Sequence, residues 1–121
     1  MDNTAKKVLI IEDETALSHA LSLKLTHEGF TVTVASNGQL GLEAMNGQQF
    51  DVVLLDLIMP VMDGFQVLEK MRALPAMPVV FVLSNLSQHE DEGRAMALGA
   101  HKFFIKSDTP LTTIVEEVKN A

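Results

Sequence analysis

The stretch VVLLDLIMPVMDGF, residues Val52–Phe65, joins a buried strand to an acid and then to a turn. Its apolar run is broken by Asp56, and Pro60 and the Asp63-Gly64 pair follow shortly after. A short, nearly continuous apolar run is typical of a strand that is covered on both faces, as in a parallel sheet. Proline and Asp-Gly predict that the chain then turns. A core strand has no structural need to end on a carboxylate, so the position of Asp56 calls for a chemical explanation.

Four further segments match the strand pattern and recur at a steady spacing along the chain. They are short, apolar and rich in β-branched residues or phenylalanine. One of them alternates polar and apolar residues and is therefore expected nearer an edge of the sheet. With residues 52–55, the predicted strands are KVLII (7–11), the alternating TVTVA (31–35), PVVFVL (78–83) and KFFI (102–105).

Helical patterns lie between these strands. Leu17, Leu21 and Leu25 repeat at helical spacing, and Gly29 follows as the predicted C-terminal cap. The last helix is predicted to begin with Thr109 as N-cap and Pro110 as its first residue. Its buried stripe is predicted to be Leu111, Ile114, Val115 and Val118. Three capping boxes are predicted at helix starts, namely Ser36 with Gln39, Asp63 with Gln66, and Ser87 with Glu90.

The order of elements is strand then helix, repeated five times with no linker between units. Residues 1–121 are therefore expected to form one domain. Five units are too few for an eight-stranded barrel, and right-handed crossovers leave an open α/β sheet. We predict a flavodoxin-like, doubly wound (βα)5 fold with a five-stranded parallel sheet in the order 2-1-3-4-5.

Composition excludes several classes of function. The formal net charge is −7, from 16 acidic and 9 basic residues, which argues against direct nucleic-acid binding. No apolar segment approaches the roughly 20 residues that a membrane span requires, and the start of the chain lacks a signal-peptide core. Cytoplasmic residence without membrane contact is the resulting expectation. Because the chain has no cysteine, disulfides, thiolate catalysis and cysteine metal sites are all excluded.

Polar side chains end or follow four of the predicted strands. Glu12 and Asp13 follow the first strand, Asp56 the third, Ser84 the fourth and Lys106 the fifth. Ligands of doubly wound sheets bind beyond the carboxyl ends of the strands, so the three carboxylates are expected to converge there. Converging carboxylates repel one another, and a divalent cation relieves that repulsion. Oxygen ligands without histidine or thiolate suit Mg²⁺.

A lysine and a serine at the same edge point to a phosphoryl group beside the cation. Lys106 would supply positive charge and Ser84 a hydrogen bond to phosphoryl oxygens. Asp56 is then the expected nucleophile, because a carboxylate can form an acyl phosphate. Taken singly, Asp13 also fits a helix cap, Glu12 and Lys106 fit solvated surface charges, and Ser84 fits a turn residue. It is the set of five on one rim that favours chemistry.

The whole chain resembles the receiver domain of two-component response regulators. The resemblance is carried by VLIIEDE, DVVLLDLIMPVMDGF, VVFVLSN and LGAHKFFIKS in this order and spacing. It implies that Asp56 is the phosphoacceptor and that Glu12, Asp13 and the backbone carbonyl of Ile58 hold Mg²⁺ with it. It further implies that Lys106 and Ser84 contact phosphoryl oxygens and that Phe103 is the aromatic switch residue.

The resemblance also implies partners and an output. A histidine kinase or histidine phosphotransfer protein would phosphorylate Asp56, changing the face of the fourth helix, fifth strand and fifth helix that contacts a downstream protein target. Such a domain catalyses its own phosphorylation and dephosphorylation and is not a turnover enzyme. The chain ends after the fifth helix, so a stand-alone receiver is expected, with a piece of a longer regulator as the alternative.

Ser107 and Asn85 depart from the usual receiver pattern, and Ile58 and Leu86 are two further positions of interest. Ser107 follows Lys106 where related chains commonly have a proline, often after a cis bond. Asn85 is larger than the usual residue after Ser84 and is expected to narrow access to Asp56. Ile58 and Leu86 are bulky and apolar where an attacking water would pass, and this predicts slow self-dephosphorylation.

Three other functions fit the same residues less well. A flavin- or nucleotide-binding module needs a glycine- or hydroxyl-rich phosphate loop after the first strand, where this chain has acids. A phosphatase-type hydrolase needs a general acid two residues beyond Asp56, where Ile58 stands. A degenerate receiver that binds partners without phosphorylation is the third, and it ranks below the phosphoryl-accepting switch because all five site side chains are competent.

Overall fold

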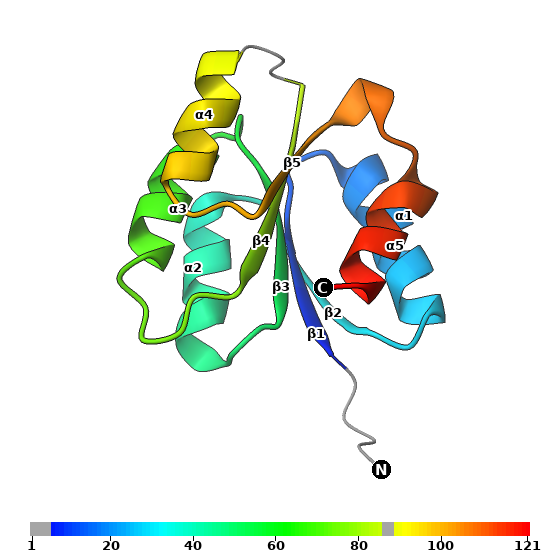
Figure 1. Ribbon diagram of the computed structural model, residues 1–121. Coiled ribbons are helices and arrows are strands. Elements are labelled where there is room, and N and C mark those ends of the chain that lie inside the picture. The colour runs from blue at the N-terminus through cyan, green and yellow to red at the C-terminus, as the bar shows by residue number, and fades with distance from the viewer. Residues whose placement is uncertain (1–5, 86–88) are drawn as a thin grey trace.

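The computed structural model describes residues 6–85 and 89–121, and its elements alternate along the chain as predicted. Figure 1 shows a central sheet with helices on both sides. The strands are β1 Lys7–Ile11, β2 Thr31–Ala35, β3 Val52–Asp56, β4 Val79–Ser84 and β5 Lys102–Ile105. The helices are α1 Thr15–His27, α2 Gly38–Gly47, α3 Gly64–Met71, α4 His89–Ala97, the short 3₁₀ helix η1 Lys106–Asp108, and α5 Leu111–Lys119.

The five strands are parallel and lie in the order β2-β1-β3-β4-β5, which confirms the predicted fold class and strand order. The alternating strand β2 is at an edge, also as predicted. The third strand in sequence lies at the centre of the sheet, and all five of its residues, Val52–Asp56, are buried. Asp56 and Ser84 are the last residues of their strands rather than the first residues of the loops.

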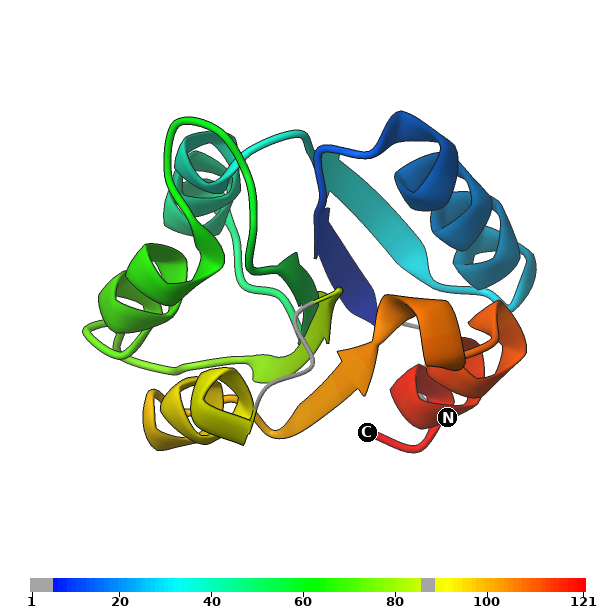
Figure 2. The same cartoon turned by 90° about the horizontal axis from the view of Figure 1, so that it is seen from above.

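Strand side chains alternate between two apolar cores, one on each face of the sheet. In β1, Leu9 and Ile11 belong to the core beneath α2, α3 and α4, while Val8 and Ile10 belong to the core beneath α1 and α5. Seen from above, α1 and α5 lie on one side of the sheet and the other three α-helices on the opposite side (Figure 2). Both faces are therefore covered, as near-continuous apolar strands require.

The predicted helical stripes are confirmed. Leu21 and Leu25 are fully buried in α1. The C-cap of α1 is Glu28 rather than the predicted Gly29, which follows it with a φ of +99°, as the glycine after a C-cap commonly does. Ile114, Val115 and Val118 of α5 are buried, and Leu17 and Leu111 pack at the margin of the same core. None of the helices in the described part of the chain is long and apolar enough to cross a membrane.

The predicted helix starts are partly corrected. The capping box of Asp63 with Gln66 is confirmed. The cap of α2 is Asn37, whose side chain accepts from the Leu40 N–H at 2.9 Å, rather than Ser36. The N-cap of α5 is Pro110, not Thr109, whose hydroxyl bonds elsewhere. Ser87, the third predicted cap, lies outside the described residues.

Adjacent phenylalanines in β5 both reach the interior, although their alternation suggests that only one belongs to the core. Phe103 packs against the core beneath α2, α3 and α4, whereas Phe104 packs against the opposite core. There the Phe104 ring meets Phe81 edge to face, with 5.9 Å between ring centroids. Because helices cover both faces of the sheet, an alternating pair in a strand finds apolar partners on each side.

Candidate phosphoryl and metal site

Three acidic side chains meet at the carboxyl end of the central strands. Glu12 follows β1, where its N–H donates to the Ala35 carbonyl, and Asp56 ends the neighbouring strand β3. Glu12, Asp13 and Asp56 each offer one carboxylate oxygen, and these oxygens all lie within 4.8 Å of one another. Glu12 and Asp56 are buried and Asp13 is exposed. The predicted convergence of carboxylates is confirmed, because parallel strands bring their carboxyl ends to one edge.

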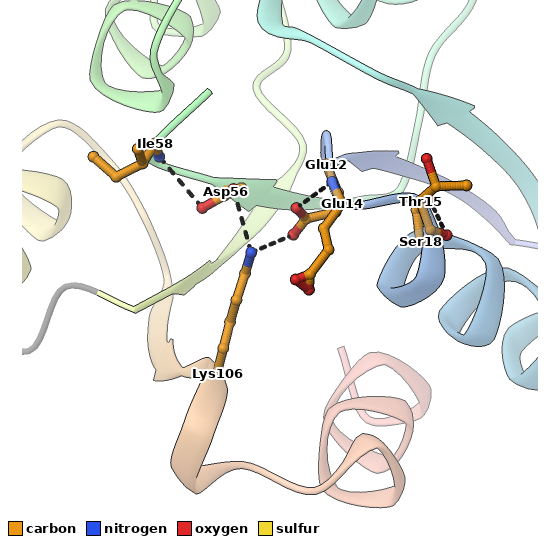
Figure 3. Close-up of polar contacts among 7 residues, drawn as sticks. All are labelled: Glu12, Glu14, Thr15, Ser18, Asp56, Ile58 and Lys106. Carbon is orange, nitrogen blue, oxygen red and sulfur yellow. Dashed lines mark hydrogen bonds and ion pairs between the residues drawn. The ribbon is translucent and has the colours of Figure 1, made fainter. Parts of the chain in front are cut away.

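Lys106 links two of these acids (Figure 3). Its Nζ lies 2.8 Å from Glu12 Oε1 and 3.3 Å from Asp56 Oδ2. The lysine side chain is only 13% exposed, so these ion pairs are shielded from water. A lysine at the end of the edge strand β5 thus extends across to the ends of β3 and β1. Its position beside Asp56 suits contact with a group that is bound to that carboxylate.

Burial dominates the proton affinity of the two buried acids. Desolvation raises the pKa of Glu12 to about 7 despite the opposing hydrogen bond from Lys106. Burial also raises the pKa of Asp56, against the attraction of Lys106 and the hydrogen bond from the Ile58 N–H. For Lys106, burial lowers the pKa, but its contacts with Glu12 and Asp56 outweigh burial and raise it. The lysine is therefore charged while it bridges the acids.

The loop after Asp56 is tightly held to the end of β3. The Ile58 N–H donates to Asp56 Oδ1 at 3.3 Å, and the Gly64 N–H donates to the Leu57 carbonyl at 2.9 Å. A Cβ on Gly64 would lie 2.4 Å from the Asp56 carbonyl oxygen, so only glycine permits this approach. Val61 adopts a φ of 72° between Pro60 and Met62, an outlier for a β-branched residue.

A crevice of about 450 Å³ opens over the acids. Asn85 lines it, which confirms its place beside Asp56, and Ile58 lines it as well. Glu14, which the sequence did not single out, is also at its mouth, and the Glu14 N–H donates to Glu12 Oε2 at 3.0 Å. Its position directly after Glu12 and Asp13 in the sequence could have indicated that it lies beside them. The crevice residues are Asp13, Glu14, Asp56, Ile58, Asn85 and Lys106.

The other predicted site residues lie on β4 and β5. Ser84 is fully buried at the end of β4, where it pairs with Ile105 in the sheet register. Phe103 is half-buried and packs against the core beneath α2, α3 and α4. The Lys106–Ser107 peptide bond is trans, and the chain continues as η1. Leu86 lies outside the described residues.

The donor set fits a hard divalent cation. Three carboxylates within one small crevice supply oxygen ligands, and no histidine or thiolate competes with them among these residues. Exposed Asp13 leaves one side of the cluster open to water, which Mg²⁺ retains in its coordination sphere. The arrangement can therefore hold Mg²⁺ beside Asp56. Ile58 is near enough in the chain to contribute its carbonyl, which stays a prediction.

Comparison with known proteins identifies the family of this chain. The protein-family model described as the response regulator receiver domain matches residues 8–118. A probable transcriptional regulator, ycf29 of Porphyra purpurea, is 31% identical over 93% of this chain and 54% of its own length. The cell cycle response regulator CtrA of Brucella ovis is 32% identical over 83% of this chain and 43% of its own length. The chain thus spans about half the length of the curated relatives it matches.

Solved structures agree with this assignment. A CheY-like response regulator receiver domain protein from Methanospirillum hungatei superposes with a TM-score of 0.90 at 25% identity, covering 97% of this chain and 93% of that one. The response regulator TrrA of Thermotoga maritima, in complex with Mg²⁺ and BeF, has a TM-score of 0.82 at 26% identity, covering 95% and 97% of the two chains. The sequence, the fold and the acidic crevice lead to one conclusion: this chain belongs to the response regulator receiver domain family.

Proposed function

We propose that this receiver domain is a phosphoryl-accepting switch whose phosphoacceptor is Asp56. The observation that carries the proposal is the contact of Asp56 with Lys106 at the crevice, within the carboxylate cluster that Asp56 forms with Glu12 and Asp13. A buried carboxylate beside a charged lysine and two further acids is costly unless a ligand compensates it. A phosphoryl group together with Mg²⁺ meets that requirement.

The chemistry is an in-line transfer from a phosphohistidine of a partner protein. An Asp56 oxygen bonds to phosphorus as the donor's P–N bond breaks, and the electron pair leaves with the imidazole, which takes a proton from solvent. Bound Mg²⁺ would neutralise phosphoryl oxygens while Glu12, Asp13, Asp56 and the Ile58 carbonyl hold it. Lys106 and Ser84 would contact the remaining oxygens. The domain promotes its own phosphorylation and dephosphorylation and does not turn over a substrate.

The proposed partners are a histidine kinase or histidine phosphotransfer protein as donor and a downstream protein as target. Phosphorylation adds negative charge beside Lys106 and Ser84, at the ends of β5 and β4. The charge would bias the position of Ser84 and Phe103 and so alter the α4–β5–α5 face. The similar TrrA structure holds Mg²⁺ and BeF, which supports the same ligand chemistry in this chain.

The first test is intact mass after incubation with acetyl phosphate and Mg²⁺. We expect a gain of one phosphoryl group, lost in Asp56→Asn. Asp51→Asn is the matched control, because Asp51 stands just before the opposite end of the same strand and is exposed. Phosphorylation of Asp56→Asn at the wild-type level would contradict the proposal.

The metal site is tested by thermal unfolding. Mg²⁺ that binds the native state should raise the melting temperature by mass action. Asp13→Ala should abolish that shift, whereas a shift unchanged in this variant would contradict the assigned ligands.

The phosphorylation and thermal-unfolding measurements together address the second candidate, a degenerate receiver, which the position of Asn85 over the crevice favours. An unphosphorylated wild type with intact Mg²⁺ binding that gains phosphate in Asn85→Ala would indicate a blocked site.

The lifetime of the phosphorylated state is a further property to measure. Ile58 is 58% exposed and lines the crevice, and we infer that its apolar side chain hinders the approach of water to Asp56. We expect slow self-dephosphorylation that Ile58→Asn accelerates, followed by the loss of phosphoryl mass with time. A half-life of seconds in the wild type would contradict this expectation.

A further inference from the structure

Thr109 closes the turn that carries Lys106. Its hydroxyl Oγ1 donates a hydrogen bond to the Ile105 carbonyl at 2.8 Å. Ile105 is the last residue of β5, and the three residues of η1, Lys106–Asp108, lie between the two bonded groups. A single side-chain hydrogen bond therefore ties the far side of the turn back to the end of the strand.

The turn is a short 3₁₀ helix. A 3₁₀ helix of three residues has poor hydrogen-bond geometry and is marginal by itself. Its N-cap residue Ile105 has a hydrocarbon side chain, which has no group that could cap the turn. Thr109 is extended, with φ −120° and ψ 111°, as expected before Pro110. Threonine is also stiff about χ1, so its hydroxyl can hold the Ile105 carbonyl at a small entropic cost.

The geometry of this turn determines where the lysine points. Lys106 is the first residue of η1, so any change in the turn reorients its Cα–Cβ bond. Its Nζ must reach Glu12 at 2.8 Å and Asp56 at 3.3 Å, and these acids follow β1 and end β3. In catalytic sites, a displacement of about 1 Å can cost about 100-fold in rate. A loosened turn would thus weaken contacts that depend on Lys106.

We propose that Thr109 is a positioning residue that holds Lys106 toward Asp56 during phosphoryl transfer. The inference rests on the proposed function, because it assigns Thr109 to the same site. Thr109 is not among the residues that line the crevice, and it acts through the turn and Lys106. In this chain Ser107 follows Lys106 in a trans bond, and the Thr109 hydroxyl closes the turn.

The first experiment compares substitutions that differ in one atom group. Thr109→Val keeps the shape of the side chain and removes the donor, and Thr109→Ser keeps the donor and removes the methyl group. Thr113→Val, on the exposed side of α5, is the matched control. With acetyl phosphate and Mg²⁺, we expect the initial phosphorylation rate to fall about tenfold in Thr109→Val, to stay within about twofold in Thr109→Ser and to be unchanged in Thr113→Val. An unchanged rate in Thr109→Val would overturn the proposal.

A double-mutant cycle separates positioning from general damage to the fold. If Thr109 acts through Lys106, Thr109→Val has no further effect on the rate in a Lys106→Met background. A loss by the same factor in both backgrounds would overturn the proposal, because the hydroxyl would then act without the lysine.

The cycle can also be measured without phosphorylation. If the wild type gains no phosphoryl group, the proposed function fails. Urea unfolding of the wild type, Thr109→Val, Lys106→Met and the double variant then tests the role of Thr109 separately. A loss of stability from Thr109→Val that shrinks in Lys106→Met supports the positioning of the lysine. Equal losses in both backgrounds contradict it.

Discussion

Helices α3 and α4 cover the same face of the sheet but are attached to it very differently. Five of the eight residues of α3 are buried, and its start is fixed by the Asp63–Gln66 capping box. Among residues 90–97 of α4, by contrast, Ala95 alone is buried, and Gly93 lies in the middle of the helix. α3 follows the loop of Asp56, whereas α4 follows the strand that ends in Ser84.

This difference assigns the two helices different roles. α3 anchors the loop that follows Asp56, because its first residue Gly64 lies against the Asp56 carbonyl. α4 has few buried apolar contacts, which places it among the segments that open or shift at low free-energy cost. One contact that ties them together is the Arg94 guanidinium, 4.1 Å from the centroid of the Phe65 ring. Under the proposed function, a change of charge at the site would reposition α4 while α3 stays in place.

The largest expected difference is between core truncations in the two helices. Leu68 of α3 is fully buried, so Leu68→Ala should lower the free energy of unfolding by about 3 kcal/mol. Met96 of α4 is 41% exposed, and Met96→Ala should change it by no more than about 0.5 kcal/mol. Urea unfolding measures both, and similar losses in the two variants would erase the distinction between the helices.

The same glycine-to-alanine change should act with opposite sign in the two helices. Gly64→Ala would drive its Cβ into the Asp56 carbonyl and the Leu57 backbone and should cost about 2 kcal/mol. It should also slow phosphorylation, since Asp56 must shift. Gly93→Ala meets nothing within 4 Å and should stabilise the protein by about 0.5–1 kcal/mol through helix propensity. Thermal unfolding of the pair, with phosphoryl uptake by mass, decides between these outcomes.

The buried acid Glu12 of the site should make the stability of the protein depend on pH. Glu12 has a pKa of about 7 in the folded protein against 4.5 as its ordinary value, so its proton favours the folded state. The contribution is complete below about pH 4.5 and is lost as the pH rises through 7. We expect the loss to be on the order of 2 kcal/mol in metal-free buffer.

Glu12→Gln should remove most of this slope, because the amide does not titrate. Glu90→Gln, in the exposed first turn of α4, should leave it unchanged. Urea unfolding between pH 5 and 8 measures the slope. A wild-type stability that rises steadily with pH across this range would contradict the assignment, because the unfolded state would then bind more protons.

The smallest expected effect is at the contact between the two helices. Arg94→Ala removes the cation over Phe65 and should cost about 0.5–1 kcal/mol, whereas Arg94→Lys should cost less. Hydrogen exchange should quicken in α4 and stay unchanged in α3, since α3 is held by its own buried residues. Equal acceleration in both helices would mean that they open as one unit.

Much of the fold and site could be predicted from short-range features of the sequence. Apolar runs and their spacing predicted five parallel strands, and the topology then placed the strand ends together. Glu12, Asp13, Asp56 and Lys106 do meet, because the carboxyl ends of parallel strands share one edge of the sheet. Asn85 likewise lies over the crevice where its place after Ser84 predicted it. Cap positions were less certain, since Asn37 and Ser36 compete one residue apart for the same helix start.

The sequence by itself thus determined the fold class, the strand order and the convergence of Glu12, Asp13, Asp56 and Lys106, but not the place of Glu14 in the crevice. Only the tertiary structure decided which partners each side chain meets. Lys106 lies closer to Glu12 than to Asp56, Thr109 bonds to Ile105 rather than capping α5, and Arg94 covers Phe65. Periodicity and strand ends are properties of neighbouring residues, and a sequence displays them directly. Contacts between side chains depend on register, loop closure and burial, which exist only once the chain has folded.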